Sequence, residues 1–256
     1  MTKRVLITGI AGSLGSHFAD ERLGHGYQER LRGCLSPQVH PIREIPASLD
    51  SKFEVHLEDV CDPDTVTRTL EGIDTVYHFA AAVGAGQSMY EIAQCTSISN
   101  LGTAVLLEAL SKRAVERLIV ASSMSIYGEG LNRDPRGRLQ NVSERSSKQF
   151  GRSDWERHGQ VGEPLVPLPT PESKIPMASS VDAFSKYDQE RFLLIVGGVY
   201  RIPNRGLAIL PCLWTAAGTL APRHQSAFHS GIPVSERSPA AGLQRRLSAA
   251  GRCHCL

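Results

Sequence analysis

The sequence contains no apolar run of about 18 residues, the length that a membrane-spanning helix requires. The residues that follow Met1 to Arg4 form a short strand-like stretch and not the apolar core of a signal peptide. These two absences predict a cytoplasmic protein. The 256 residues are 41% hydrophobic and 21% charged, which excludes collagen-like and disordered classes and leaves an ordinary globular protein.

Neither sign of charge dominates the chain. Lysine and arginine total 28 residues against 26 aspartates and glutamates, a net charge of +2. Proteins that bind nucleic acid or anionic membranes through charge carry a strong positive excess, which is missing here. We therefore expect neither nucleic acid nor membrane among the partners.

The cysteines lack the repeated pairs that structural zinc sites and disulfide frameworks show. Five segments of the chain share them: Cys34, Cys61, Cys95, Cys212 and the terminal pair Cys253 and Cys255. The segment Cys253-His254-Cys255 has the composition of half a metal site, but such a triplet at a chain end is more often accidental than ligating. We expect no metal.

Alternating short apolar runs and helical segments predict an α/β fold. The expected strands are residues 4–8, 53–57, 74–79, 117–121 and 206–210, and the expected helices are residues 12–23, 63–70, 89–112 and 181–200. Strands separated by crossover helices pair in parallel. The prediction is a doubly wound, mostly parallel sheet with helices on both faces.

Three segments depart from this pattern. Residues 27–34 stand where a second strand is due, but their charges make a central strand a weak prediction. Residues 129–176 are polar and rich in proline and glycine, which predicts an excursion over the surface that could act as a lid. Residues 212–256 show neither helical nor strand periodicity of apolar residues, and they contain one acidic residue. We therefore expect an irregular tail there.

Three glycines follow the first expected strand and open the first helix. Gly9, Gly12 and Gly15 lie in the segment Thr-Gly-Ile-Ala-Gly-Ser-Leu-Gly of residues 8–15. Glycines let a pyrophosphate approach the unpaired amides of a helix N-terminus, where the helix dipole favours negative charge. A plain strand-to-helix turn is the alternative, but the flanking strand and helix favour dinucleotide binding.

From this turn onward the chain resembles the extended short-chain dehydrogenase/reductases, especially nucleotide-sugar epimerases and dehydratases. The likeness continues through residues 59–62 (Asp-Val-Cys-Asp), 77–82 (Tyr-His-Phe-Ala-Ala-Ala), 100–103 (Asn-Leu-Gly-Thr), 121–128 (Ala-Ser-Ser-Met-Ser-Ile-Tyr-Gly) and 185–190 (Ser-Lys-Tyr-Asp-Gln-Glu). The ordered motifs cover about the first four fifths of the chain. The resemblance implies a Rossmann-like NAD-binding domain over residues 1–211, with residues 212–256 in place of a substrate domain.

The resemblance implies a set of cofactor-binding residues: Gly9, Gly12, Ser13, Leu14, Gly15, Asp59, Val60, Ala80, Ala81, Asn100 and Lys186. Asp59 and Val60 would meet the adenine, and the two alanines would line the pyrophosphate and ribose. Each residue has a structural alternative when it is taken singly. The aspartate could be a turn residue, the alanines close-packing contacts, and Asn100 an internal cap.

The same resemblance implies a catalytic serine, a tyrosine and a lysine four residues after that tyrosine. Ser123 fits the serine and Lys186 the lysine, but the tyrosine position is Asp182. In the family, the phenolate takes a hydroxyl proton as hydride passes to the cofactor, and a ketone intermediate then turns over. A carboxylate is about six pKa units less basic than a phenolate, so catalysis should fall on the order of 10² to 10⁴-fold.

Alternatives remain open at the catalytic positions. Asp182 and Lys186 could form an i,i+4 ion pair. Tyr187 is turned about 100° around the helix from Lys186, and the resemblance assigns Tyr127 to a loop near the substrate, so neither is expected to replace the missing phenol.

The resemblance implies NAD as the cofactor and a nucleotide-activated sugar as the substrate, with 4-epimerisation favoured over dehydration. Dehydratases place an acid pair where this chain has Met124 and Ser125. Gly33, with Arg32 beside it, stands where the family has its ribose-binding acid. A damaged segment, in line with the weak strand prediction at residues 27–34, is the favoured interpretation, and a preference for NADP is the alternative. The family forms dimers through the helices that correspond to residues 89–112 and 181–200, which permits a homodimer here.

Resemblance and periodicity are lost together after the last expected strand. We hypothesise that the coding frame slips near Arg205 or Leu210 and that the substrate lobe is lost. The competing class is a catalytically silent nucleotide-binding protein or a decayed gene product.

Overall fold

The structure is a computed structural model that describes residues 3–10, 12, 14–16, 18–19, 28–33, 53–113, 115–142 and 144–209. Its strands are β1 (Arg4–Thr8), β2 (Gln28–Gly33), β3 (Glu54–Leu57), β4 (Thr75–His78), β5 (Arg117–Ser123), β6 (Leu131–Arg133), β7 (Leu139–Asn141), β8 (Val166–Leu168) and β9 (Asn204–Ile209). Its helices are α2 (Pro63–Thr69), α3 (Ile92–Thr96), α4 (Gly102–Lys112), α5 (Ser147–Gly151) and α6 (Val181–Tyr200). Short 3-10 turns cover Gln87–Met89 and Met124–Tyr127, and Ser97–Leu101 form a π-helical turn.

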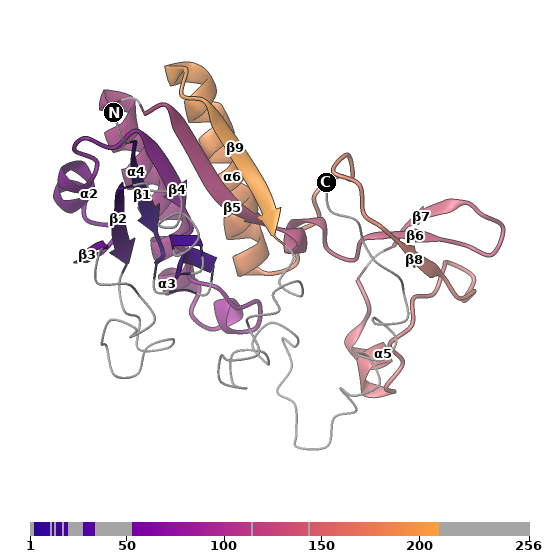
Figure 1. Ribbon diagram of the computed structural model, residues 1–256. Coiled ribbons are helices and arrows are strands. Elements are labelled where there is room, and N and C mark those ends of the chain that lie inside the picture. Colours follow the sequence, from indigo (N-terminus) through magenta and orange to yellow (C-terminus); the bar gives the residue numbers. More distant parts are fainter. Residues whose placement is uncertain are drawn as a thin grey trace.

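Six strands form one parallel sheet in the order β3-β2-β1-β4-β5-β9 (Figure 1). Within each strand, neighbouring side chains point to opposite faces. Leu6, Val76 and Leu118 accordingly join the core beneath α2, α4 and α6. Val5, Ile7 and Tyr77 face the other side, where they pack with Phe18 and Ala19 of a helical segment. The doubly wound fold predicted from the sequence is therefore confirmed.

The strand that the sequence predicted only weakly at residues 27–34 is present as β2, which pairs in parallel with both β1 and β3. Arg30 is directly opposite Glu54 in the register, and its Nε lies 3.1 Å from a carboxylate oxygen of that residue. Its Nη1 donates to the carbonyls of Thr69 and Glu71 at 2.9 and 3.0 Å. A charge with these partners can occupy an inner strand, and the partners come from distant parts of the chain.

The other predicted elements differ from the structure mainly at their ends. The helix expected over residues 89–112 begins at Ile92 and contains the π-helical turn at Ser97–Leu101. The last strand is Asn204–Ile209 rather than residues 206–210, and Leu210 lies outside the described residues. Of the helix expected over residues 12–23, residues 14–16 and 18–19 are helical and the rest is only partly described. The predictions for residues 212–256, which include the triplet at Cys253, lie outside the described residues.

Residues 129–176 contain more regular structure than their composition indicated. β6 pairs antiparallel with β7 and with β8, and α5 lies between β7 and β8 in sequence. Figure 1 shows this small sheet to one side of the six-stranded sheet. Each of its strands has three residues, too few for an alternating pattern to be recognised in the sequence. The segment rejoins the main domain through Met177, whose N–H donates to the carbonyl of Ile126 at 2.7 Å.

No helix in the described ranges has the length and apolar character that crossing a bilayer would take.

Candidate functional site

The glycine turn after β1 lies against the carboxyl end of β4. Gly9 has a φ of +74°, and a Cβ on it would lie 2.7 Å from the backbone nitrogen of Ala80. A Cβ on Gly15 would lie 2.5 Å from the carbonyl oxygen of Gly9. The N–H of Gly12 donates to that same carbonyl at 3.1 Å. The backbone at Gly9 and Gly15 leaves no room for a side chain, which is the geometry that a phosphate-binding turn needs.

This turn lies where the strand order reverses. The chain passes from β1 outward to β2 and β3, and then returns to β4 on the other side of β1. In open parallel sheets, ligands bind at the carboxyl ends of the strands beside such a switch point. Gly9, Ala80 and Ser123 follow or end β1, β4 and β5, so the fold brings these predicted residues to one edge of the sheet. Ala81 is adjacent, Leu14 is half-buried in the helical segment, and Ser13 lies outside the described residues.

Asp59 and Val60 follow β3 at the same edge. Asp59 is exposed, and its Oδ1 accepts a hydrogen bond from the N–H of Cys61 at 2.9 Å. Val60 is 6% exposed, and a Cβ on Gly102 would lie 2.5 Å from its Cγ1. The valine side chain therefore packs against the start of α4, as a structural residue would, while the aspartate stays open to solvent.

Asn100 lies in the π-helical turn and connects it to α6. Its Nδ2 donates to a carboxylate oxygen of Asp188, and its own Oδ1 is buried without a partner. The backbone N–H of Ala82 meanwhile bonds to the Ser99 hydroxyl at 3.2 Å. π-helical turns are rare in proteins, and those that occur are often found at functional sites. This one holds the segment after β4 against α6.

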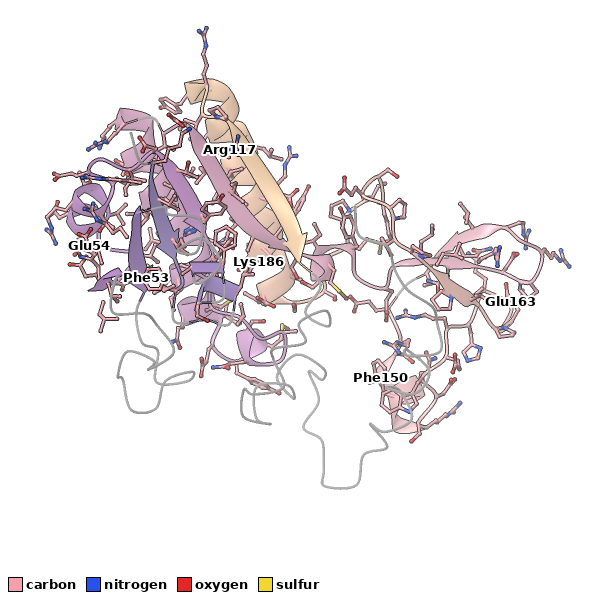
Figure 2. All side chains as sticks on the ribbon, in the orientation of Figure 1. Phe53, Glu54, Arg117, Phe150, Glu163 and Lys186 are labelled. Atoms are coloured by element: carbon pink, nitrogen blue, oxygen red, sulfur yellow. The ribbon has the colours of Figure 1, made fainter. Side chains whose placement is uncertain are left out.

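Lys186 is buried on α6 beside the end of β5 (Figure 2). Its Nζ donates to the carbonyl of Ala121 at 3.3 Å. Burial lowers the pKa of Lys186 from 10.5 to about 8, although the nearby carboxylate of Asp182 acts in the opposite direction. The predicted lysine is thus an amine that remains mostly protonated at neutral pH but is close to its titration range.

Asp182 is the second residue of α6, and its N–H donates to the Ser88 hydroxyl at 3.0 Å. Burial raises the pKa of this carboxyl, and Lys186 partly offsets the rise. One carboxylate oxygen is buried without a hydrogen-bond partner. Both side chains lie in the described part of the chain and form no ion pair there, so the i,i+4 pair considered from the sequence is absent.

Ser123 ends β5 and caps the turn that follows. Its Oγ accepts from the N–H of Ser125 at 3.2 Å and lies 2.7 Å from that residue's hydroxyl. Tyr127 ends the turn, and burial raises the pKa of its phenol. The serine is therefore positioned by its own loop, at the sheet edge that also carries the glycine turn.

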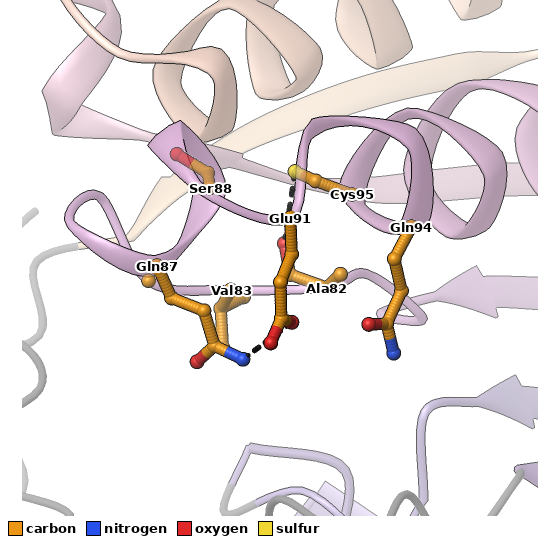
Figure 3. A pocket seen from close by; sticks show the side chains of 8 residues that line it. Ala82, Val83, Gln87, Ser88, Glu91, Gln94 and Cys95 are labelled. Atoms are coloured by element: carbon orange, nitrogen blue, oxygen red, sulfur yellow. Dashed lines mark hydrogen bonds between the residues drawn. The ribbon is translucent and has the colours of Figure 1, made fainter.

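A shallow pocket opens beside the first turn of α6 (Figure 3). It is lined by Ala82, Val83, Gly84, Gln87, Ser88, Glu91, Gln94 and Cys95. Ser88 connects it to Asp182, and Cys95 lies with its Sγ 3.9 Å from the Ser185 hydroxyl. Neither Ser88 nor Cys95 is predicted as a site residue from the sequence, because a serine or cysteine inside an irregular segment carries no periodic signal.

The fold and this edge define a Rossmann-like α/β protein with a glycine turn at its switch point. The family model described as NAD dependent epimerase/dehydratase family matches residues 5–152, and the chain belongs to that family.

Named relatives agree with this assignment. The chain is 28% identical over 196 residues to dTDP-L-rhamnose 4-epimerase of Burkholderia thailandensis, a match that covers 75% of this chain and 53% of the relative. The structure of UDP-glucose 4-epimerase from Thermotoga maritima with UDP-glucose gives a TM-score of 0.61 at 24% identity, with 80% of this chain and 54% of the other covered. The Thermus thermophilus UDP-glucose 4-epimerase complex with NAD gives 0.59 at 24% identity and the same coverage. The chain thus spans about half the length of these relatives.

Proposed function

We propose that this chain binds NAD at the glycine turn and belongs to the sugar 4-epimerase type, with turnover impaired by Asp182. The observation that carries the proposal is the glycine turn itself. Gly9 and Gly15 have no room for a Cβ, and the turn lies at the switch point of the sheet. This is the arrangement that lets a pyrophosphate approach the backbone of the turn and the N-terminus of the helix that follows.

The residues around the turn fit a dinucleotide. Gly9, Gly12 and Ala80 would hold the pyrophosphate, and Asp59 would reach the adenosine end from β3. Lys186 would contact the nicotinamide ribose, where its ammonium needs an acceptor besides the carbonyl of Ala121. NAD supplies the chemistry of accepting a hydride from a sugar carbon and returning it.

The proton chemistry falls to Asp182 and Ser123. In this proposal the Ser123 hydroxyl orients the sugar hydroxyl, and the Asp182 carboxylate must take its proton. Burial raises the pKa of the carboxyl and so makes it a better base than a free aspartate. An ordinary carboxyl still lies about six units below a phenol, and the shorter side chain reaches less far. Slow turnover follows.

The proposed substrate is a nucleotide-activated sugar. The relatives named above are 4-epimerases of dTDP-L-rhamnose and of UDP-glucose. Met124 and Ser125 in the turn after β5 supply no acid pair for dehydration, which supports epimerisation within the family.

We propose NAD over NADP. Gly33 ends β2 at the position where an acidic residue would hold the ribose, and its carbonyl accepts from the N–H of Glu58 at 3.1 Å. Glu58 thus lies next to this position and would disfavour a 2′-phosphate by charge repulsion.

A homodimer is the proposed assembly. Ile92 and Leu101 are exposed on the α3 to α4 segment, and Leu194, Ile195 and Val199 are exposed on α6. Apolar side chains gathered on two helices favour burial against a second copy.

The alternative is a catalytically silent nucleotide-binding protein, which Asp182 favours. Calorimetric titration with NAD and NADP tests the cofactor site, and turnover assays with UDP-glucose and dTDP-L-rhamnose test catalysis. We expect micromolar to millimolar NAD binding and weak turnover. Binding without turnover would leave the silent alternative, and absence of binding to either dinucleotide would contradict both.

A further inference from the structure

The uncharged side chain of Gln189 connects α6 to three other parts of the main domain: α4, the π-helical turn and the segment after β4. It is 0% exposed on α6, and its side-chain Nε2 lies 2.8 Å from Thr103 Oγ1 on α4. The same nitrogen lies 3.0 Å from the carbonyl of Ser99 in the π-helical turn and 3.3 Å from the carbonyl of Ala80 after β4. A single amide group therefore connects α6 to the backbone beside the glycine turn.

The contacts of Thr103 determine the direction of the hydrogen bonds beyond it. Its hydroxyl donates to the carbonyl of Ser99 at 2.5 Å, which uses its one hydrogen. It must therefore accept from Gln189 and from Nε2 of His78, which lies 3.0 Å away. A neutral imidazole that donates from Nε2 accepts at Nδ1.

His78 continues this chain of hydrogen bonds to the glycine turn. Its Nδ1 lies 2.8 Å from Thr8 Oγ1, and that oxygen accepts from the N–H of Ala80 at 3.1 Å. Burial lowers the pKa of His78 to about 3, and the charge of Lys186 acts in the same direction. The ring is therefore neutral at working pH, as one donor and one acceptor require.

We propose that Gln189 is a positioning residue, which fixes the Lys186 ammonium relative to the glycine turn by fastening α6 to the backbone after β4. The inference rests on the proposed NAD site. The two residues are three positions apart and so share a helix face, and both are buried. Without the amide, the three acceptor oxygens that share its two hydrogens would lose their donor. We expect α6 then to move away from these oxygens, which would admit water to Lys186.

The test replaces Gln189 with methionine, which keeps the length of the side chain and removes both donors. The readout is the pH profile of Lys186 acylation by acetic anhydride, followed by mass spectrometry. We expect a midpoint near the Lys186 pKa of about 8 in the natural chain and an upward shift of about one pH unit in Gln189→Met, because hydration restores the charged form. NADH affinity, measured by calorimetry, should fall about tenfold.

Two further variants separate positioning from simple loss of stability. Thr69→Val removes a hydroxyl that is 3% exposed and bonded to the carbonyl of Thr65 at 2.7 Å on α2, outside the network. It should lower stability and leave the Lys186 midpoint unchanged. Thr103→Val keeps the shape of the side chain and should shift the midpoint in the same direction as Gln189→Met, by a smaller amount.

An unchanged midpoint in folded Gln189→Met, or in Thr103→Val where the first variant does not fold, would overturn the inference. Absence of NADH binding by the natural chain would instead refute the proposed function. The acylation profile needs no cofactor, so the two failures are distinguishable.

Discussion

The Nζ of Lys186 donates a hydrogen bond to the backbone carbonyl of Ala121 at 3.3 Å, which ties α6 to β5 inside the core. The amine is 6% exposed and has no carboxylate in salt-bridge contact among the described residues. A buried amine with a neutral partner is destabilised in its charged form. Its titration should therefore be visible in both stability and cofactor binding.

The pH dependence of stability should report Lys186. Its pKa is about 8 in the folded chain and 10.5 ordinarily, so between these values the unfolded chain binds more protons. Raising the pH through this window should stabilise the natural chain relative to Lys186→Met by about 3 kcal/mol at most. Urea unfolding of both proteins at pH 7.5 to 10.5 measures the difference, and parallel pH curves would contradict it.

Cofactor affinity should change with pH in the opposite direction. The protonated amine is the form that donates to a ribose, so NADH binding should weaken as the pH rises through the Lys186 pKa of about 8. Calorimetry at several pH values measures this. Lys186→Arg, which stays charged, should remove the pH dependence whatever its absolute affinity.

Asp182→Tyr should increase turnover on the order of 10² to 10⁴-fold, because a phenol supplies a stronger base with longer reach. The measurement is epimerisation of UDP-glucose and dTDP-L-rhamnose, followed by chromatography. Asp182→Phe is the matched control, since it adds the ring without the hydroxyl and should restore nothing. Equal rates in the two variants would refute the role assigned to this position.

Gly9→Ala should lower stability by about 2 to 5 kcal/mol and abolish NAD binding, because the new Cβ would collide with Phe79 and Ala80 in addition to the strain of a positive φ. Gly137→Ala is the matched control. Its φ is +83° with nothing within 4 Å of a new Cβ, so it should cost about 1 to 2 kcal/mol from strain alone. Similar losses in both variants would show that the turn is not tightly packed.

Arg30→Met should destabilise the fold by about 1 to 3 kcal/mol, because the carbonyls of Thr69 and Glu71, the first of them part-buried, lose a charged donor. Glu54→Gln should cost less, since Glu54 is on the exposed side of the pair. Chemical unfolding of both variants tests this ordering. A larger loss of stability in Glu54→Gln would show that the ion pair, and not the hydrogen bonds to the carbonyls, stabilises β2.

The dimer proposal predicts that Ile195→Glu shifts the chain towards monomer in sedimentation velocity. Its side chain is 56% exposed on α6, where a second copy would bury it. Val161→Glu, at a position 90% exposed between α5 and β8, should leave the sedimentation coefficient unchanged. A natural chain that already sediments as a monomer would contradict the proposal.

The sequence by itself determined the parallel sheet and its glycine turn. The apolar runs at β1, β4 and β5 alternate with helical periodicity, and that pattern follows from local burial alone. The regular spacing of Gly9, Gly12 and Gly15 could also be recognised in the sequence, because only glycine admits the close backbone contacts of the turn.

The tertiary structure decided what depends on partners far along the chain. β2 can be a strand because Arg30 forms an ion pair with Glu54 and donates to the carbonyls at the end of α2. These partners are distant in sequence, so the local pattern of residues does not reveal them. The pKa of Lys186, the unpaired oxygen of Asp182 and the bonds of Gln189 likewise arise from burial among separate elements. Periodicity reports which face of an element is apolar, but the free energy of a buried polar group is set by neighbours that only the folded chain brings within hydrogen-bond distance.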